Sequence, residues 1–157
     1  MANKFQRIEI APDVVYDNLT VAKLINQIMR QGKKSAARRI VYGAFDIIKE
    51  KTSQNPVDVL ETALRAVGPT VEVRPRRVGG ATYQVPIEVN EKRRISLAMR
   101  WIIGASRAKK GQAMKDRLAG ELMQSSKNEG EAIKKKINVE KMAAANKAFA
   151  HLARRSG

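Results

Sequence analysis

The side chains best suited to chemistry in this sequence are lysines and arginines, and they occur in clusters. Cations at short spacing bind phosphate oxygens through charge-assisted hydrogen bonds. The clusters therefore predict contacts with the backbone of a nucleic acid. The clustered residues are Lys33, Lys34, Arg38, Arg39, Arg74, Arg76, Arg77, Lys92, Arg93, Arg94, Arg100, Arg107, Lys109, Lys110, Lys134, Lys135 and Lys136.

Lys33 and Lys34 lie between Gly32 and Ser35, an order similar to the end of a phosphate-binding loop. The full motif needs a glycine where this chain has Gln27, and the preceding residues predict a helix rather than a strand. A nucleotide-binding loop is therefore not expected. Two lysines at the start of a helix suit the phosphates of a nucleic acid, and the alternative is a pair of solvated loop lysines.

Acid–base and metal chemistry have little to work with here. His151 is the single histidine, there is no cysteine, and no carboxylate cluster with ligand spacing accompanies His151. Such a histidine is more often packed or exposed than a metal ligand or a general base. We expect no enzymatic activity, no metal, no cofactor and no small-molecule substrate.

The charge balance indicates a polyanionic partner. Lysine and arginine number 31 against 15 acidic residues, which gives a net charge of +16. Nucleic acid is the first candidate for this partner, ahead of an anionic membrane surface or a merely soluble basic protein. The sequence has no apolar run typical of a signal peptide or a membrane span. We expect no membrane association, and a protein that is cytosolic or made inside an organelle.

Apolar periodicity predicts a mainly α fold. Residues 1–18 lack periodicity and predict an extended segment. A first helix over residues 19–29 ends at Gly32, and Ser35 is a suitable N-cap for a second. Asn55 with Pro56 predicts the start of a third helix, which Gly68 ends.

The second half of the chain predicts three more helices. Asn90 is a suitable N-cap for a fourth, which ends at Gly111. A fifth begins near Met114 and ends near Gly130, and a sixth begins near Asn138. The whole, residues 1–157, predicts a six-helix single domain with a protruding two-stranded antiparallel β-ribbon between helices three and four.

Residues 70–89 form the predicted ribbon. Whether its loop has an even or an odd number of residues decides which side chains share a face. A two-residue turn at Gly79 and Gly80 places the valines of the two strands on opposite faces. A three-residue loop ending at Ala81 pairs Val71 with Val89 and unites the apolar side chains, so we favour it. Arg74, Arg76 and Gln84 then share the opposite face, while Arg77 and Tyr83 extend the apolar face. The two strand prolines, Pro75 and Pro86, suit an isolated ribbon.

Two features bear on how these residues function. Lys92, Arg93 and Arg94 lie in the first turns of the fourth helix, where cations oppose the helix dipole, so their positions favour a binding role over a stabilising one. Tyr83 near the ribbon tip is a candidate base or sugar contact, with packing on the ribbon as an equal alternative. Trp101 is more typical of the edge of a core.

Four segments together resemble one family. They read GKKSAARRIVYGAF, VGPTVEVRPRRVGGATYQVPIEV, RRISLAMRWIIGASR and KMAAANKAFAHL. They closely resemble the bacterial-type small-subunit ribosomal protein seven family, and the likeness runs from about Pro12 to the C-terminus. Family members usually begin with an arginine-rich arm, whereas this chain has only Lys4 and Arg7 there.

The resemblance implies a structural constituent of the small ribosomal subunit. It implies primary binding of 16S ribosomal RNA and nucleation of head assembly, near the messenger RNA exit and the exit-site transfer RNA. Implied neighbours are small-subunit proteins nine and eleven. The implied location is a cytoplasmic ribosome, with an organellar one left open. By position, Lys33 and Lys34 match the family's RNA-facing first loop. The residues that match its ribbon tip are Arg76, Arg77, Gly79 and Gly80, and those that match the start and middle of its fourth helix are Arg93, Arg94, Arg100 and Trp101.

A second hypothesis is an architectural DNA-binding protein. Its basic ribbon would enter the minor groove, with the prolines as wedges. Such a protein would bind duplex DNA as well as RNA.

Overall fold

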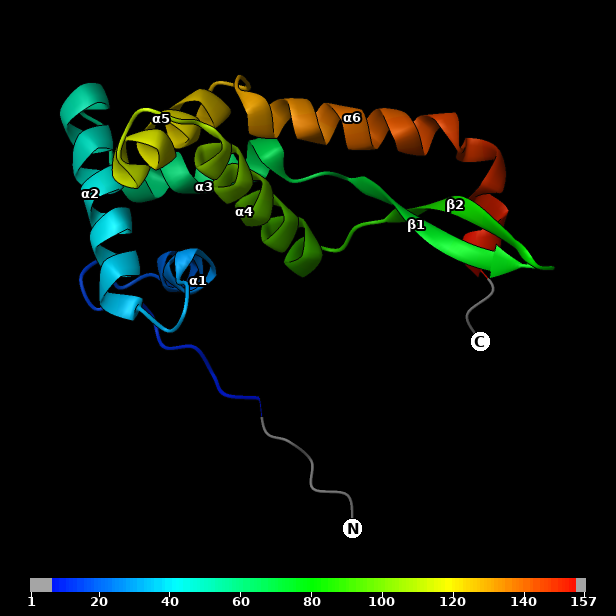
Figure 1. Ribbon diagram of the computed structural model, residues 1–157, viewed down its shortest axis with the longest axis horizontal. Coiled ribbons are helices and arrows are strands. Elements are labelled where there is room, and N and C mark those ends of the chain that lie inside the picture. Colours follow the sequence, from blue (N-terminus) through cyan, green and yellow to red (C-terminus); the bar gives the residue numbers. More distant parts are fainter. Residues whose placement is uncertain (1–6, 155–157) are drawn as a thin grey trace, which may run out of the picture.

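The chain folds into helices around one two-stranded ribbon, and the computed structural model describes residues 7–154 (Figure 1). Within these residues there are six α-helices and one 3-10 helix, so seven helices stand where six were predicted. The ribbon lies between the third and fourth helix, as predicted. The elements are α1 (Leu19–Ile28), α2 (Lys34–Thr52), α3 (Pro56–Val67), β1 (Val71–Val78), β2 (Ala81–Glu88), α4 (Glu91–Ala108), α5 (Met114–Ser126), α6 (Glu131–Ala145) and η1 (Lys147–Arg154).

Asparagine side chains fix the starts of three helices. Asn18 accepts from the backbone N–H of Val21, Asn55 from that of Val57, and Asn90 from that of Arg93. The predicted caps at Asn55 and Asn90 are confirmed. The predicted cap at Ser35 is wrong, because α2 already begins at Lys34 and no side chain caps it.

Helices α1 to α5 enclose the core. The largest fully buried side chains include Leu24, Phe45, Leu60, Ile102 and Leu122, one from each of these five helices. Only the first turn of α6 joins this core, through Ala132 and Ile133. Beyond that turn, α6 and the ribbon extend together away from the other helices (Figure 1).

The predicted ribbon register is wrong by one residue. Val71 pairs with Glu88 and Val78 with Ala81, so the turn is the two-residue Gly79-Gly80. Both glycines have positive φ, 59° and 83°, which is the requirement of a type I′ turn. Arg74, Arg76 and Tyr83 therefore share one face, and Arg77 and Gln84 share the other.

Within the described part of the chain the sheet has two strands only, as the strand prolines predicted, and the C-terminal 3-10 helix η1 packs on β2. The rings of Tyr83 and Phe149 lie 5.1 Å apart between centroids. Arg76 donates from Nη1 to the carbonyl oxygen of Leu152 at 2.7 Å. One face of the ribbon is thus covered, which explains why apolar residues occur on both faces and why the parity argument failed.

Helix α6 begins at Glu131, seven residues before the predicted start at Asn138. Gly130 cannot cap it with a side chain, and the acceptor comes from α5 instead: Glu121 Oε1 accepts from the backbone N–H of Ala132 at 2.9 Å. The Glu121 carboxylate is fully buried and forms a 2.9 Å ion pair with Lys109. A cap supplied by tertiary contact leaves no local pattern in the sequence.

The N-terminal segment has neither helix nor strand from Arg7 to Asp13, but residues 14–16 form a turn and Asp17 has a φ of 45°, so the prediction of an extended segment over residues 1–18 is wrong for its second part. The first six residues, Lys4 among them, lie outside the described part. Asp13 ties the segment to α2 by accepting from the Tyr42 hydroxyl at 2.6 Å. Burial and this bond raise the pKa of Tyr42 to about 12. Among the described residues, no helix is long and apolar enough to cross a lipid bilayer.

Candidate nucleic-acid interface

Four cations surround one hollow between the end of α1, the start of α2, the end of α4 and the start of α5. We call it the central hollow. Arg30, Lys33, Arg107 and Arg117 contribute to its lining, and none of the described residues that line it is acidic. The structure thus brings together two clusters that are about 70 residues apart in the sequence. A concave surface with cations alone suits phosphate oxygens.

Backbone carbonyls hold two of these guanidinium groups in place. Arg107 donates from Nη2 to the carbonyl oxygen of Ile28 at 3.1 Å, at the end of α1. Arg117 donates to the carbonyl oxygens of Arg107, in the last turn of α4, and of Lys109, which follows that helix. Burial lowers the pKa of Arg107, and the nearby charge of Arg30 lowers it further. The hollow therefore holds mutually repelling cations, which a bound polyanion would relieve.

The start of α2 presents the first predicted cluster as an exposed surface. Lys33, Lys34, Arg38 and Arg39 are all exposed. Lys34 and Arg38 are four residues apart and lie on one helix face. Both also line a second hollow, between the N-terminal segment and helices α1 and α2.

The three cations that start α4 divide between two roles. Lys92 is exposed and lines a third hollow together with Lys23 of α1. Arg93 contacts the buried Glu72 carboxylate of β1 at 3.3 Å. Arg94 donates to the carbonyl oxygens of Gly68 and Arg65, both at 3.1 Å. Arg93 and Arg94 therefore make contacts within the fold as well, and their predicted contact with RNA stays a prediction.

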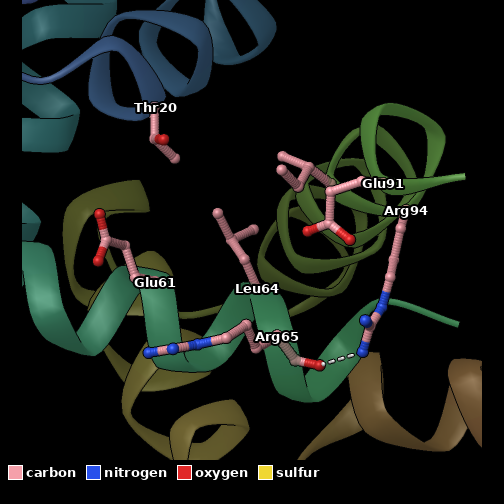
Figure 2. A pocket seen from close by; sticks show the side chains of 7 residues that line it. Thr20, Glu61, Leu64, Arg65, Glu91 and Arg94 are labelled. Carbon is pink, nitrogen blue, oxygen red and sulfur yellow. Dashed lines mark hydrogen bonds between the residues drawn. The ribbon is translucent and has the colours of Figure 1, made fainter.

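Figure 2 shows the surroundings of Arg94, in a hollow between α1, α3 and α4. The Arg94 side chain runs to the Arg65 carbonyl at the end of α3. The Glu61 and Glu91 carboxylates also line this hollow. Since carboxylates repel phosphate, this hollow is the least suited of those described here to a polyanion.

The ribbon cations also differ in their surroundings. Arg74 forms an ion pair with Glu72 at 2.7 Å. Burial would raise the pKa of Glu72, but hydrogen bonds from Arg74 and Arg93 outweigh it, and the pKa is lowered. Arg76 is bound to Leu152, whereas Arg77 is exposed on the other face. Gly79 and Gly80 form an exposed tip.

The remaining predicted residues are spread over the molecule. Arg100, Lys110, Lys134 and Lys135 are exposed, although Lys134 pairs with Glu131. Lys136 donates to the Ala66 carbonyl oxygen at 3.0 Å. Trp101 is half-buried against the core, as predicted for a core-edge residue. These residues do not join the central hollow.

Three cations of the central and third hollows, Lys23, Arg30 and Arg117, are not among the predicted residues. Arg30 stands three residues before the predicted Lys33, whereas Lys23 and Arg117 lie apart from the predicted clusters in the sequence, and helix packing brings them beside clustered cations. No local pattern marks them.

Comparison with known proteins gives consistent matches along the chain. A family model described as ribosomal protein S7p/S5e matches residues 2–147. The chain is 60% identical over 146 residues to a protein of Thermotoga neapolitana, covering 93% of this chain and 94% of that one. It is 60% identical over 143 residues to a protein of Dictyoglomus turgidum, covering 91% and 92%. Both relatives are named small ribosomal subunit protein uS7.

Proposed function

Since the chain belongs to the ribosomal protein S7p/S5e family, we propose that it binds 16S ribosomal RNA directly and nucleates assembly of the small-subunit head. The coarser function follows from the family itself. The chain is a structural, non-enzymatic protein of the small ribosomal subunit that acts in translation with ribosomal RNA and proteins. Its resemblance to this family, predicted from four sequence segments, is confirmed.

The central hollow carries this proposal. Arg30, Lys33, Arg107 and Arg117 reach it from four helix ends, and carbonyl oxygens orient two of the three guanidinium groups. The charges of Arg30 and Arg107 lie close enough to repel each other, and this repulsion costs folding stability. A bound polyanion explains the presence of both cations better than packing does. Helical RNA offers closely spaced phosphates at such a concave surface.

The exposed cations around this hollow extend the proposed RNA surface. Lys34, Arg38 and Arg39 continue it along α2. Lys92, at the opposite end of α4 from Arg107, adds a separate proposed contact in the third hollow. The other predicted RNA contacts remain proposals of the same kind. Arg93, Arg94 and Arg76 bond to other parts of the chain and, unlike Arg107 and Arg117, do not line the central hollow, so we assign them to holding the scaffold more than to primary anchoring.

The ribbon tip is proposed to face the messenger RNA exit and the exit-site transfer RNA. Gly79, Gly80 and Arg77 are exposed there, far along the extension that the ribbon and α6 form (Figure 1). Small-subunit proteins nine and eleven are the proposed protein neighbours. We also propose that residues 1–157 act as one RNA-binding domain in a cytoplasmic ribosome.

Binding to transcripts that tile the small-subunit ribosomal RNA tests this proposal. If about eight phosphates are contacted, log K falls against log salt with a slope of roughly −6 to −7. The double variant Arg107→Ala, Lys33→Ala lowers affinity and makes the slope shallower by about one to two. Glu61→Gln with Glu91→Gln, in the acidic hollow of Figure 2, is the matched control and does not lower affinity. A basic-residue double variant that binds like the unchanged protein would remove the support of the central hollow.

A further inference from the structure

Exposed apolar side chains gather at the N-terminal segment. Of the seven large apolar residues that are exposed among those described, five lie between positions 8 and 19. They are Ile8, Ile10, Val14, Val15 and Leu19. Single exposed apolar residues need no explanation, but such a concentration marks an interaction surface.

The part of this surface from Asp13 to Tyr16 is held in place by side-chain contacts. Asp13 Oδ2 accepts from the backbone N–H groups of Val15 and Tyr16, and Oδ1 accepts from the Tyr42 hydroxyl. The ring of Tyr16 packs edge-on against Phe45, with centroids 5.0 Å apart. The turn therefore keeps Val14 and Val15 exposed, at 87% and 66% of their surface, although they are apolar.

Beside this turn lies the second hollow, which we call the N-terminal hollow. Its volume is about 280 Å³, and Ile10, Ala22 and Ile25 give it apolar walls. Lys34 and Arg38 of α2 also line it. Its two carboxylates differ, since both oxygens of Asp13 are occupied by hydrogen bonds, while Glu9 is exposed.

We propose that the N-terminal hollow receives an unpaired nucleotide of the bound RNA. The flat face of the base would pack on Ile10 and the apolar wall, and its phosphate would lie at Lys34 and Arg38. An unpaired nucleotide carries an apolar base face and an anionic phosphate within one residue. The hollow offers the complementary groups, which are an apolar wall and two cations. This inference rests on the proposed function, and it adds a base contact to the phosphate contacts argued above.

Charge favours an anionic occupant such as RNA over a neutral or basic protein segment. The hollow opens between cations of α2, on a chain with a net charge of +16. An acidic peptide with apolar side chains would also satisfy this charge, and the experiment below separates the two.

The first test removes the apolar rim. Ile8→Ser with Ile10→Ser weakens binding to small-subunit ribosomal RNA transcripts by about tenfold, on the scale of one lost base contact. The salt slope stays unchanged, because no phosphate contact is lost. Ile137→Ser with Met142→Ser, which alters two exposed apolar residues of α6, is the matched control and binds normally. All variants keep the unfolding temperature of the unchanged protein, since the altered residues are exposed.

The second test locates the contact. The chain has no cysteine, so Val14→Cys provides a single attachment point for a photo-activated cross-linker. We expect cross-links to one unpaired nucleotide and its neighbours. Cross-links confined to a paired helix, or only to another protein in the assembled subunit, would overturn the inference.

The two proposals fail separately. If the unchanged protein does not bind the transcripts above its binding to unrelated RNA, the proposed function is wrong. If it binds but the Ile8, Ile10 double variant binds equally well, only the assignment of the N-terminal hollow is wrong.

Discussion

Arg76 of β1 donates a 2.7 Å hydrogen bond to the carbonyl oxygen of Leu152, which fastens the ribbon to the C-terminal 3-10 helix η1. The contact between Tyr83 and Phe149 adds to this attachment. The ribbon and the C-terminal segment are therefore one extension and not two independent arms. Neighbouring cations of β1 consequently differ in what they do.

This arrangement predicts different stabilities for two adjacent substitutions. Arg76→Ala lowers the free energy of unfolding by about 1 kcal/mol, because it removes a charge-assisted hydrogen bond from a half-buried side chain. Arg77→Ala, on the exposed face, leaves it within about 0.5 kcal/mol. Urea unfolding measures both, and amide hydrogen exchange in residues 147–154 shows whether η1 loosens in Arg76→Ala. Equal stabilities with unchanged exchange would mean that Arg76 does not hold η1.

The buried Glu121 carboxylate predicts a larger loss. Glu121→Ala removes the acceptor for the Ala132 N–H and the partner of Lys109, so the free energy of unfolding falls by about 2–3 kcal/mol. Glu121→Gln keeps an oxygen acceptor and loses only the charge, so its cost is smaller. Both are measured by urea unfolding. The control is the exposed Glu129→Ala, and a Glu121→Ala protein as stable as this control would contradict the capping role.

Arg94 predicts a difference between arginine and lysine. Lysine cannot span the two carbonyl oxygens of Arg65 and Gly68 with a planar fork, although it keeps the charge. Arg94→Lys therefore lowers the free energy of unfolding by about 1–2 kcal/mol while the salt slope of RNA binding stays the same. Arg100→Lys, an exposed position on the same helix, serves as the control. A shallower salt slope without a loss of stability would assign Arg94 to the RNA instead.

Acid is expected to weaken the attachment of the N-terminal segment. Burial raises the pKa of Asp13, but the hydrogen bonds from Tyr42, Tyr16 and Val15 outweigh this, and the pKa lies below its ordinary 3.8. A carboxyl with a lowered folded-state pKa stabilises the fold above that ordinary value, and this contribution is lost as the pH falls through the lower folded-state pKa. The stability difference between the unchanged protein and Asp13→Asn is therefore full at about pH 6 and shrinks below about pH 3.8. A difference independent of pH would contradict this role.

The sequence predicts well what is decided locally. Asn55 and Asn90 are capping residues followed by amphipathic helices, and both caps form as expected. The Gly79-Gly80 pair likewise marks the hairpin. These features depend on a few adjacent residues, so they can be recognised without knowing the packing.

What depends on tertiary contact was not predictable in the same way. The register argument assumed that apolar side chains occupy one face of the ribbon and that the opposite face is exposed to solvent. In the structure, η1 packs on β2 through polar as well as apolar contacts, so that assumption does not hold. The start of α6 depends on Glu121, ten residues earlier. Arg30 and Arg117 join the central hollow only because four helix ends meet there.

Competition between RNA and DNA tests the central claim most directly. The unchanged protein is bound to a labelled small-subunit ribosomal RNA transcript at moderate salt, and unlabelled transcript or duplex DNA is added as competitor. We predict that the ribosomal RNA competes better than duplex DNA by orders of magnitude, because folded RNA shape adds to the phosphate contacts. Equal competition by duplex DNA would contradict the account and favour a DNA-binding role for the basic ribbon.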